Sequence, residues 1–156
     1  MLSQTTEYAL RAVVCLAATP EQPKTSQQLA DETLVPSGYM SKVLQELGRA
    51  GLVRSQRGLH GGSMLTRSPE DVTILDVVNA IEPIRRIDKC PLGLESHVKL
   101  CPLHRRLDEA MGQVESAFSG TTISELMKEK AESTPLCESL KPTQVTVKKT
   151  KRSKSR

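Results

Sequence analysis

The chain has 156 residues, enough for one compact domain with an additional helix or tail but too few for a large multidomain enzyme. Only Tyr8, Tyr39 and Phe118 are aromatic, so the core must be aliphatic, which favours helices over a β-sandwich. The net charge is +4, but the last sixteen residues hold seven Lys and Arg and no acid, which leaves 15 basic and 18 acidic residues, or −3, for the rest. Nucleic-acid binding must therefore be argued from local clusters.

The first half of the chain shows three segments with helical periodicity. Ala9, Ala12, Val13 and Leu16 lie on one face of a first helix that ends at 19–20. Ser26 is the expected N-cap of a short second helix that runs to residue 33. A third helix begins near 36–37 and ends at Gly51, and its buried face is Met40, Val43, Leu44 and Leu47. We expect these helices to form a compact trihelical unit.

The segments 52–57 and 63–66 have the length of strands, and three glycines lie in the turn 58–62 between them. They predict a β-hairpin with a flexible tip. Ser68, Pro69 and two acids then predict the start of a helix that buries Ile74, Val77, Val78 and Ile81 and stops before Pro83.

Little periodicity is present between residues 83 and 102, although this loop holds two cysteines and His97. A heptad-like stripe follows, which predicts a helix that packs against a second copy of itself. Its members are Leu103, Leu107, Ala110, Met111, Val114 and Ala117. A last short helix, 121–130, begins with a capping box formed by Thr122 and Glu125. The predicted organisation is a DNA-binding domain at 1–68, a linker helix, cysteine loop and dimerisation helix at 69–132, and a disordered basic tail at 133–156.

The longest apolar run is seven residues, 12–18, whereas a membrane-spanning helix needs about 20. The N-terminus has neither a basic n-region nor a cleavage site, so we expect a cytoplasmic protein without a membrane partner. The cysteines Cys15, Cys90, Cys101 and Cys137 would then serve in ligation, redox chemistry or burial rather than in disulfides.

Helix, turn, helix and a glycine-tipped hairpin form the element order of a winged helix-turn-helix, a mostly α fold whose second helix of the pair enters the major groove of DNA. Short polar and cationic side chains can reach base edges or phosphates. A side-chain-free tip lets an Arg approach the minor groove, and Arg57 is the leading candidate. From spacing alone, a solvated surface explains these residues equally well. The candidate DNA contacts are Ser37, Tyr39, Ser41, Lys42, Gln45, Arg54, Arg57, Gly58, His60 and Gly61.

Several motifs together resemble the Rrf-two family of bacterial winged-helix transcription regulators. They are Thr6-Glu-Tyr-Ala-Leu-Arg11, Val35-Pro-Ser-Gly-Tyr-Met40, Val43-Leu-Gln-Glu-Leu47, Ala50-Gly-Leu-Val53 and Ser55-Gln-Arg-Gly-Leu-His-Gly-Gly62. The resemblance covers about residues 1–132. It implies a homodimer that binds an operator with dyad symmetry and usually represses transcription. The wing signature of the family corresponds to residues 57–62 and its recognition helix to residues 36–49.

The loop holds Cys90 and, after ten residues, Cys101, which His104 follows closely. Thiolates are the preferred ligands of iron–sulfur clusters, and a His can replace one of them. This pattern resembles the cluster-binding segment of the iron–sulfur regulators in the family, but those relatives carry a third cysteine, which is missing here. A [2Fe–2S] cluster would need further ligands, for which His97, His104 and Glu7 are candidates. Glu7 stands where some relatives supply a carboxylate from the other subunit.

Three alternatives remain beside the cluster: a redox-active thiol pair, two unligated cysteines, or a zinc site. A regulator without metal, controlled by a thiol switch, a metabolite or a partner protein, is therefore the second functional hypothesis. An enzyme is the third, since Cys101 and His104 could form a nucleophile and its base, but no orienting group or oxyanion donor can be named.

Overall fold

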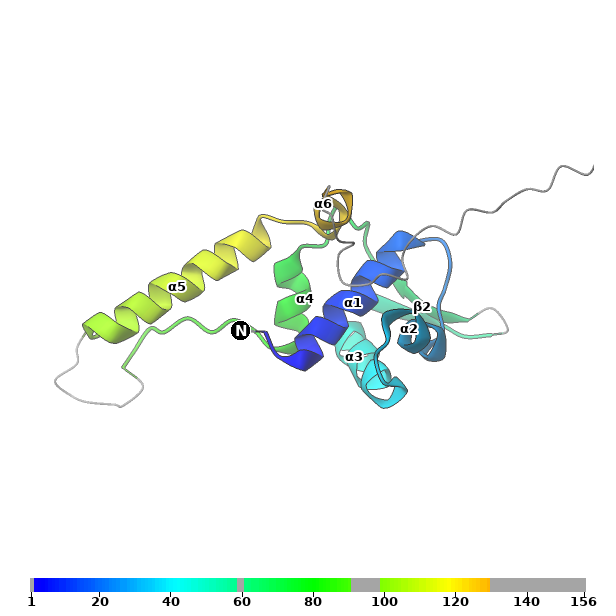
Figure 1. Cartoon of the computed structure of the whole chain (residues 1–156), viewed down its shortest axis with the longest axis horizontal. Helices are drawn as coiled ribbons and strands as arrows, with labels where there is room; N and C mark the ends of the chain where they lie inside the picture. The colour runs from blue at the N-terminus through cyan, green and yellow to red at the C-terminus, as the bar shows by residue number, and fades with distance from the viewer. Residues whose placement is uncertain (1, 59–60, 91–98, 130–156) are drawn as a thin grey trace, which may run out of the picture.

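The computed structural model describes residues 2–58, 61–90 and 99–129, and it has the predicted mostly α, winged helix-turn-helix architecture. A compact body holds most of the helices and one hairpin, and a long helix projects from it (Figure 1). The elements are α1 (Gln4–Ala18), α2 (Ser26–Thr33), α3 (Ser37–Arg49), β1 (Val53–Gln56), β2 (Gly62–Leu65), α4 (Ile74–Ile81), α5 (Pro102–Ser119) and α6 (Ile123–Lys128).

Helix α1 lies at the centre of the body and packs against α2, α3, α4 and α6. Its sequence QTTEYALRAVVCLAA is buried almost continuously from Ala9 to Ala17, because neighbours cover several of its faces. Ser3 caps its first turn through a hydrogen bond from the Thr6 N–H, and Thr19 ends it as predicted. The small side chains of Ala9 and Ala12 allow the surrounding helices to approach closely.

The second and third helices form the predicted helix-turn-helix, with one correction. The N-cap of α2 is Thr25 and not Ser26, because Thr25 accepts from the Gln28 N–H while the Gln28 side chain accepts from the Thr25 N–H. The turn between the helices places Leu34 in the left-handed region at φ 55°. The chain then continues through the buried Val35 into α3.

The hairpin pairs β1 with β2 in antiparallel register, with Val53 opposite Leu65 and Gln56 opposite Gly62. Gly62 therefore belongs to β2 and not to the tip. A single residue of the α1–α2 connection, Lys24, forms an isolated antiparallel bridge with Ser63. This bridge extends the hairpin toward the helical body, and the sequence analysis did not predict it.

Helix α4 starts later than predicted. Ser68 to Asp71 forms a turn in which the Asp71 N–H donates to the Ser68 carbonyl over 2.8 Å. The helix begins instead at Ile74, because Thr73 and Asp76 form a reciprocal capping box. It ends before Pro83 as predicted, and Val77 and Val78 are buried.

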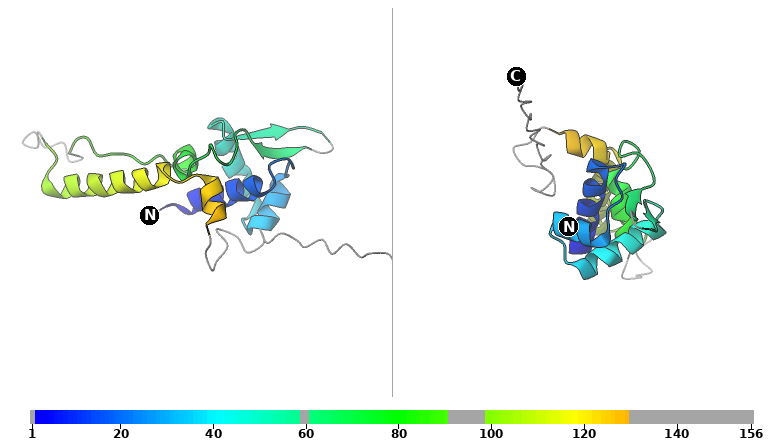
Figure 2. Two further views of the ribbon diagram at one scale, coloured as in Figure 1. Left: turned by 90° about the horizontal axis from the view of Figure 1, so that it is seen from above. Right: turned by 90° about the vertical axis from the view of Figure 1, so that its right-hand side faces the viewer.

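Helix α5 begins at Pro102 and has no buried residue. It extends from the body on the side opposite to the hairpin (Figure 2). Helix α6 returns to the body, where Thr122 and Glu125 form the predicted capping box and Ile123 is fully buried. Within the described ranges, no helix combines the length and the apolar character required to cross a membrane.

The glycine at position 62 is required by the approach of the α1–α2 connection. A Cβ added there would lie 2.6 Å from the Lys24 carbonyl carbon, whereas a Cβ at Gly48 of α3 would meet only the Val53 carbonyl oxygen at 3.7 Å. We expect Gly62→Ala to lower the free energy of unfolding by about 2 kcal/mol, since backbone must move. Gly48→Ala should raise it by about 0.5–1 kcal/mol, since alanine favours a helix. Urea denaturation followed by circular dichroism tests both, and equal stability of the two variants would contradict this account of the wing.

Candidate nucleic-acid interface

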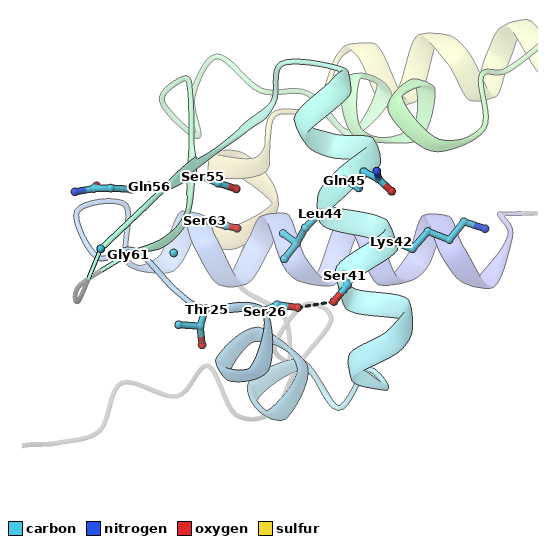
Figure 3. Close-up of a pocket in the computed structure, with 12 residues that line it drawn as sticks. Thr25, Ser26, Ser41, Lys42, Leu44, Gln45, Ser55, Gln56, Gly61 and Ser63 are labelled. Carbon is cyan, nitrogen blue, oxygen red and sulfur yellow. Dashed lines mark hydrogen bonds between the residues drawn. The ribbon is translucent and has the colours of Figure 1, made fainter.

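A polar groove of about 750 Å³ lies between α3 and the wing, the β1–β2 hairpin. Figure 3 shows the groove with α3 and the wing on its two sides and with Leu44 directed into the space between them. Among the described residues that line it, one is a lysine, none is acidic and most carry a hydroxyl, an amide or no side chain at all. They are Thr25, Ser26, Ser41, Lys42, Leu44, Gln45, Ser55, Gln56, Gly58, Gly61, Gly62 and Ser63. This composition suits hydrogen bonding to an anionic, polar ligand.

Helix α3 has a buried and an exposed face, and Leu44, predicted on the buried face, is only half-buried and lines the groove. Met40, Val43 and Leu47 are fully buried against the body. The side chains expected to contact DNA from this helix are exposed on the other face, namely Ser37, Tyr39, Ser41, Lys42 and Gln45. The core packing of α3 therefore fixes the direction in which these polar side chains extend.

The one carboxylate on the exposed half of α3 is already paired. Arg49 Nη1 donates to Glu46 Oε1 over 2.9 Å, one helical turn away. The pair is at the surface, so it contributes little stability. It does offset the charge that would otherwise repel a phosphate backbone.

Tyr39 is 53 % exposed at the start of α3 and stacks edge-on against Tyr8 of α1, with ring centroids 5.8 Å apart. The guanidinium of Arg11 lies 5.9 Å from the centre of the Tyr8 ring. Arg11 also donates to the Thr33 carbonyl at the end of α2. These contacts place the Thr6-to-Arg11 motif directly behind α3.

The predicted wing residues lie on the exposed part of the hairpin. Arg54 is on β1, and Arg57 and Gly58 follow that strand; all three are exposed. Gly58 has φ 116°, and a Cβ on Gly61 would lie 2.4 Å from the Gln56 carbonyl oxygen, so both positions require glycine. His60 lies outside the described residues.

Sequence analysis missed the residues that reach the groove from outside α3 and the tip. Thr25 and Ser26 come from the start of α2, and Ser26 Oγ lies 3.1 Å from Ser41 Oγ (Figure 3). Ser55, Gln56 and Ser63 come from the wing strands. Pairings between residues far apart in the chain, the Lys24–Ser63 bridge and the Ser26–Ser41 hydrogen bond, bring these segments together.

The candidate metal ligands are brought together only in part. Cys101 Sγ lies 3.2 Å from His104 Nδ1 at the start of α5. Cys90 is buried, and Glu7 is exposed on α1. The described residues contain no group of three or more His, Cys, Asp or Glu that could hold a metal ion. His97 lies outside the described residues. A [2Fe–2S] cluster needs about four ligands, and the described donors of this chain are not gathered into such a set.

A second, apolar groove of about 710 Å³ separates α5 from the body. Leu107, Ala110, Met111, Val114 and Phe118 line it from α5. The other wall is lined by Leu2, which precedes α1, and by residues of α1, α4 and the segment after α4, among them Glu7, Val78 and Ile84. Both walls carry apolar side chains, which suits contact with another protein surface.

An ion-pair cluster ties the segment after α4 to α5. Arg86 donates to both carboxylate oxygens of Asp108 over 2.7 Å and to Glu115 over 3.4 Å, and the Ile87 N–H donates to Asp108 over 2.8 Å. The Arg86 guanidinium, together with the Ile87 N–H, lowers the pKa of Asp108 to about 2. Gly112 makes room for Arg86, because a Cβ there would lie 3.0 Å from its Nη1.

Comparison with known proteins agrees with this geometry. Residues 2–129 match Rrf2, the Rrf-two family of the sequence resemblance, described as an iron-dependent transcriptional regulator. A relative from Aquifex aeolicus (strain VF5), named "Putative HTH-type transcriptional regulator", is 28 % identical over 131 residues, which are 81 % of this chain and 91 % of the relative.

Two solved structures share the fold. CymR, the global cysteine regulator of B. subtilis, is 27 % identical with a TM-score of 0.68, and the match covers 81 % of this chain and 95 % of CymR. T. potens IscR is 22 % identical with a TM-score of 0.69, and the match covers 85 % and 93 % of the two chains. The chain therefore belongs to the Rrf2 family, and it is a DNA-binding transcriptional regulator rather than an enzyme.

Proposed function

We propose that the protein is a homodimeric repressor in which two copies of α3 and the wing bind a dyad-symmetric operator. The observation that carries the proposal is the exposed apolar stripe on α5. Leu103, Leu107, Met111 and Val114 are 64, 44, 37 and 45 % exposed in the single chain, although they repeat at the spacing of a helical seam. A second copy of α5 is the occupant whose periodicity matches this stripe. A regulator that binds DNA acts in the compartment that holds DNA, which agrees with the expected cytoplasmic location.

The organisation expected from the sequence suits this function. Residues 1–68 hold the helix-turn-helix and the wing, and residues 69–132 hold α4, the cysteine segment, α5 and α6. We propose that the first part binds the operator and the second joins the subunits. The basic tail at 133–156 lies outside the described residues, and we propose that it contacts phosphates without reading sequence.

In the proposed interface, α3 enters the major groove and the wing follows the adjacent backbone. Ser41 and Gln45 would contact base edges, and Lys42 would contact either a base or a phosphate. Arg54 and Arg57 would contact phosphates or the minor groove. Tyr39 and Ser37, at the start of α3, would contact the sugar-phosphate backbone. Close backbone approach at Gly58 and Gly61 would let the tip carry His60 to the duplex.

The dimer seam can be tested by a charge placed within it. We expect Met111→Glu to weaken dimerisation by about 3 kcal/mol or more, because each subunit would bury an unpaired carboxylate. Ser116→Glu adds the same charge to the opposite, exposed face of α5 and should leave the dimer intact. Sedimentation equilibrium measures the dimer dissociation constant of both variants. A wild-type protein that remains monomeric at micromolar concentration, or a Met111→Glu protein that still dimerises fully, would contradict the seam.

The DNA contacts can be tested through the salt dependence of binding. Each neutralised phosphate contributes about 0.9 to the magnitude of the slope of log K against log salt. A dimer that loses one phosphate contact per subunit should therefore show a slope whose magnitude is smaller by about 1.8. We expect this loss for Arg57→Ala, and a comparable or smaller one for Lys42→Ala. Fluorescence anisotropy with a duplex that the wild-type protein selects from a randomised library gives the slope.

The control for this experiment is Lys128→Ala, which removes the same charge from α6, where the lysine pairs with Glu70 at the surface. It should leave both affinity and slope unchanged. If Arg57→Ala behaves like Lys128→Ala, then Arg57 does not contact DNA.

For the sensing mechanism, the contact between Cys101 and His104 favours the regulator without a cluster. In the described part of the chain, this contact brings together two potential metal ligands, the Cys101 thiol and the His104 imidazole, at the first turn of α5. We propose that a change at Cys101 acts on the orientation of α5, and hence on the spacing of the two recognition helices. An effector of this kind must bind two dimer conformations with different free energies.

A spectrum separates this proposal from the cluster. We expect protein purified without oxygen to show no charge-transfer absorption beyond about 300 nm and to contain no iron or sulfide. Stoichiometric iron and sulfide that Cys101→Ser abolishes would contradict the metal-free regulator. That result would instead support a [2Fe–2S] cluster held by Cys90, Cys101 and His104 together with Glu7.

A further inference from the structure

The consecutive residues Lys24, Thr25 and Ser26, where the α1–α2 connection meets α2, each contact a different element of the DNA-binding part: the wing, α2 and α3. The Lys24 N–H donates to the Ser63 carbonyl over 3.1 Å, and the Ser63 N–H donates to the Lys24 carbonyl over 2.7 Å. Thr25 caps α2. Ser26 lies 3.1 Å from Ser41 of the recognition helix, as the dashed line in Figure 3 shows. The segment 24–26 is therefore the link between the wing, α2 and α3.

The side chain of Lys24 turns away from the groove and into the body. Its ammonium donates to Glu32 Oε2 on α2, and the same oxygen accepts from the thiol of Cys15 on α1 over 3.1 Å. The side chain of Lys24 is only 14 % exposed, and Cys15 is completely buried. One carboxylate thus joins α1, α2 and the residue that anchors the wing.

The charged state of Glu32 is maintained by these contacts. Burial raises the pKa of Glu32, but the hydrogen bonds from Lys24 and Cys15 more than compensate, so that the pKa lies below its ordinary value. The carboxylate is consequently ionised at neutral pH and attracts the Lys24 ammonium. A partly buried pair of this kind is less screened by salt than a surface pair.

The backbone of Lys24 also fits tightly against the wing. A Cβ on Gly62 would lie within 2.6–2.8 Å of three Lys24 backbone atoms, and Ser63 is 6 % exposed. A shift of Lys24 would therefore move β2, since no free space separates the two segments.

We propose that Lys24 is a positioning residue for DNA binding, in that its ion pair with Glu32 fixes the wing relative to the recognition helix while the lysine itself touches no DNA. The inference rests on the proposed interface between α3 and the wing. Thr25 and Ser26 line that groove, whereas Lys24 lies behind it. Without the ion pair, the wing would sample several positions, and a duplex would have to restrict them on binding.

The first test reverses the ordinary electrostatic expectation. Glu32→Gln removes a negative charge from the DNA-binding half, which by general electrostatics should tighten binding to a polyanion. We expect it instead to weaken binding on the order of ten-fold, because the wing loses its anchor. Asp31→Asn is the matched control: Asp31 is the exposed neighbour on α2, it accepts from Gln27 over 2.9 Å, and the asparagine keeps that acceptor. The Asp31→Asn variant should bind the duplex with an affinity equal to or higher than that of the wild type.

The second test is a double-mutant cycle with Arg57. Lys24→Met keeps the backbone bridge and the aliphatic stem but removes the ammonium. If Lys24 acts through the wing, Lys24→Met should weaken binding on the order of ten-fold in the wild type but by less than about three-fold once Arg57→Ala has removed the wing contact. If Lys24 bound a phosphate directly, the two effects would add, and the salt slope of Lys24→Met would fall as that of Arg57→Ala does.

Affinities are measured by anisotropy with the duplex selected by the wild-type full chain, after circular dichroism has shown that each variant is folded at the assay temperature. Should Lys24→Met fail to fold, the cycle is run with Glu32→Gln. Wild-type affinity or tighter binding for Glu32→Gln, or full additivity in the cycle, overturns the role of Lys24. Failure of the wild type to select any duplex would instead overturn the proposed interface.

Discussion

The packing of α3 against α1 is the constraint on which the rest of the molecule depends. α1 is buried almost continuously from Ala9 to Ala17, and Met40, Val43 and Leu47 of α3 are completely buried. Each fully buried aliphatic side chain of this size contributes about 1.5–3 kcal/mol relative to an exposed one. This apolar contact leaves α3 one rotational setting, in which Ser41, Lys42 and Gln45 extend to the outside. The chemistry of the exposed face is thus oriented by residues that never touch a ligand.

The elements predicted well from the sequence are those determined by local periodicity and local caps. Most of the buried faces of α1, α3 and α4, the capping box of α6 and the ends of α1 and α4 follow from side chains within one or two turns of each other. Leu44, Ile74 and Ile81, also predicted to be buried, are half-buried. Errors arose where two neighbouring residues could cap the same helix. Thr25 rather than Ser26 caps α2, because Gln28 completes its capping box. Ser68 also has an acid three residues later, Asp71, but it forms only a turn, and Thr73 with Asp76 caps α4 instead.

Features that depend on distant pairs were beyond local analysis. The Lys24–Ser63 bridge joins residues nearly forty positions apart, and the Arg86–Asp108 pair joins residues 22 positions apart. No local spacing indicates either pairing. For the candidate site, this means that α3 and the wing tip could be predicted, whereas the contribution of Thr25, Ser26 and the strand residues could not. His97, the further donor predicted in the cysteine loop, lies outside the described residues, so its role stays a prediction.

The two halves of the molecule meet at α4. Helix α5 packs against α4, and α4 packs against both α1 and α3. The Arg86 cluster fixes the segment that leaves α4 to the side of α5, with Asp108 held in its charged form. A rotation of α5 would therefore displace α4 in two ways, through the direct contact of the two helices and through the segment that Arg86 ties to α5. Because Val77 and Val78 of α4 are buried in a close-packed interior, a displacement of α4 would be transmitted to the helices packed against it. Through α4, this arrangement connects α5, the helix of the proposed dimer seam, to α3, the proposed recognition helix, against which the hairpin also packs.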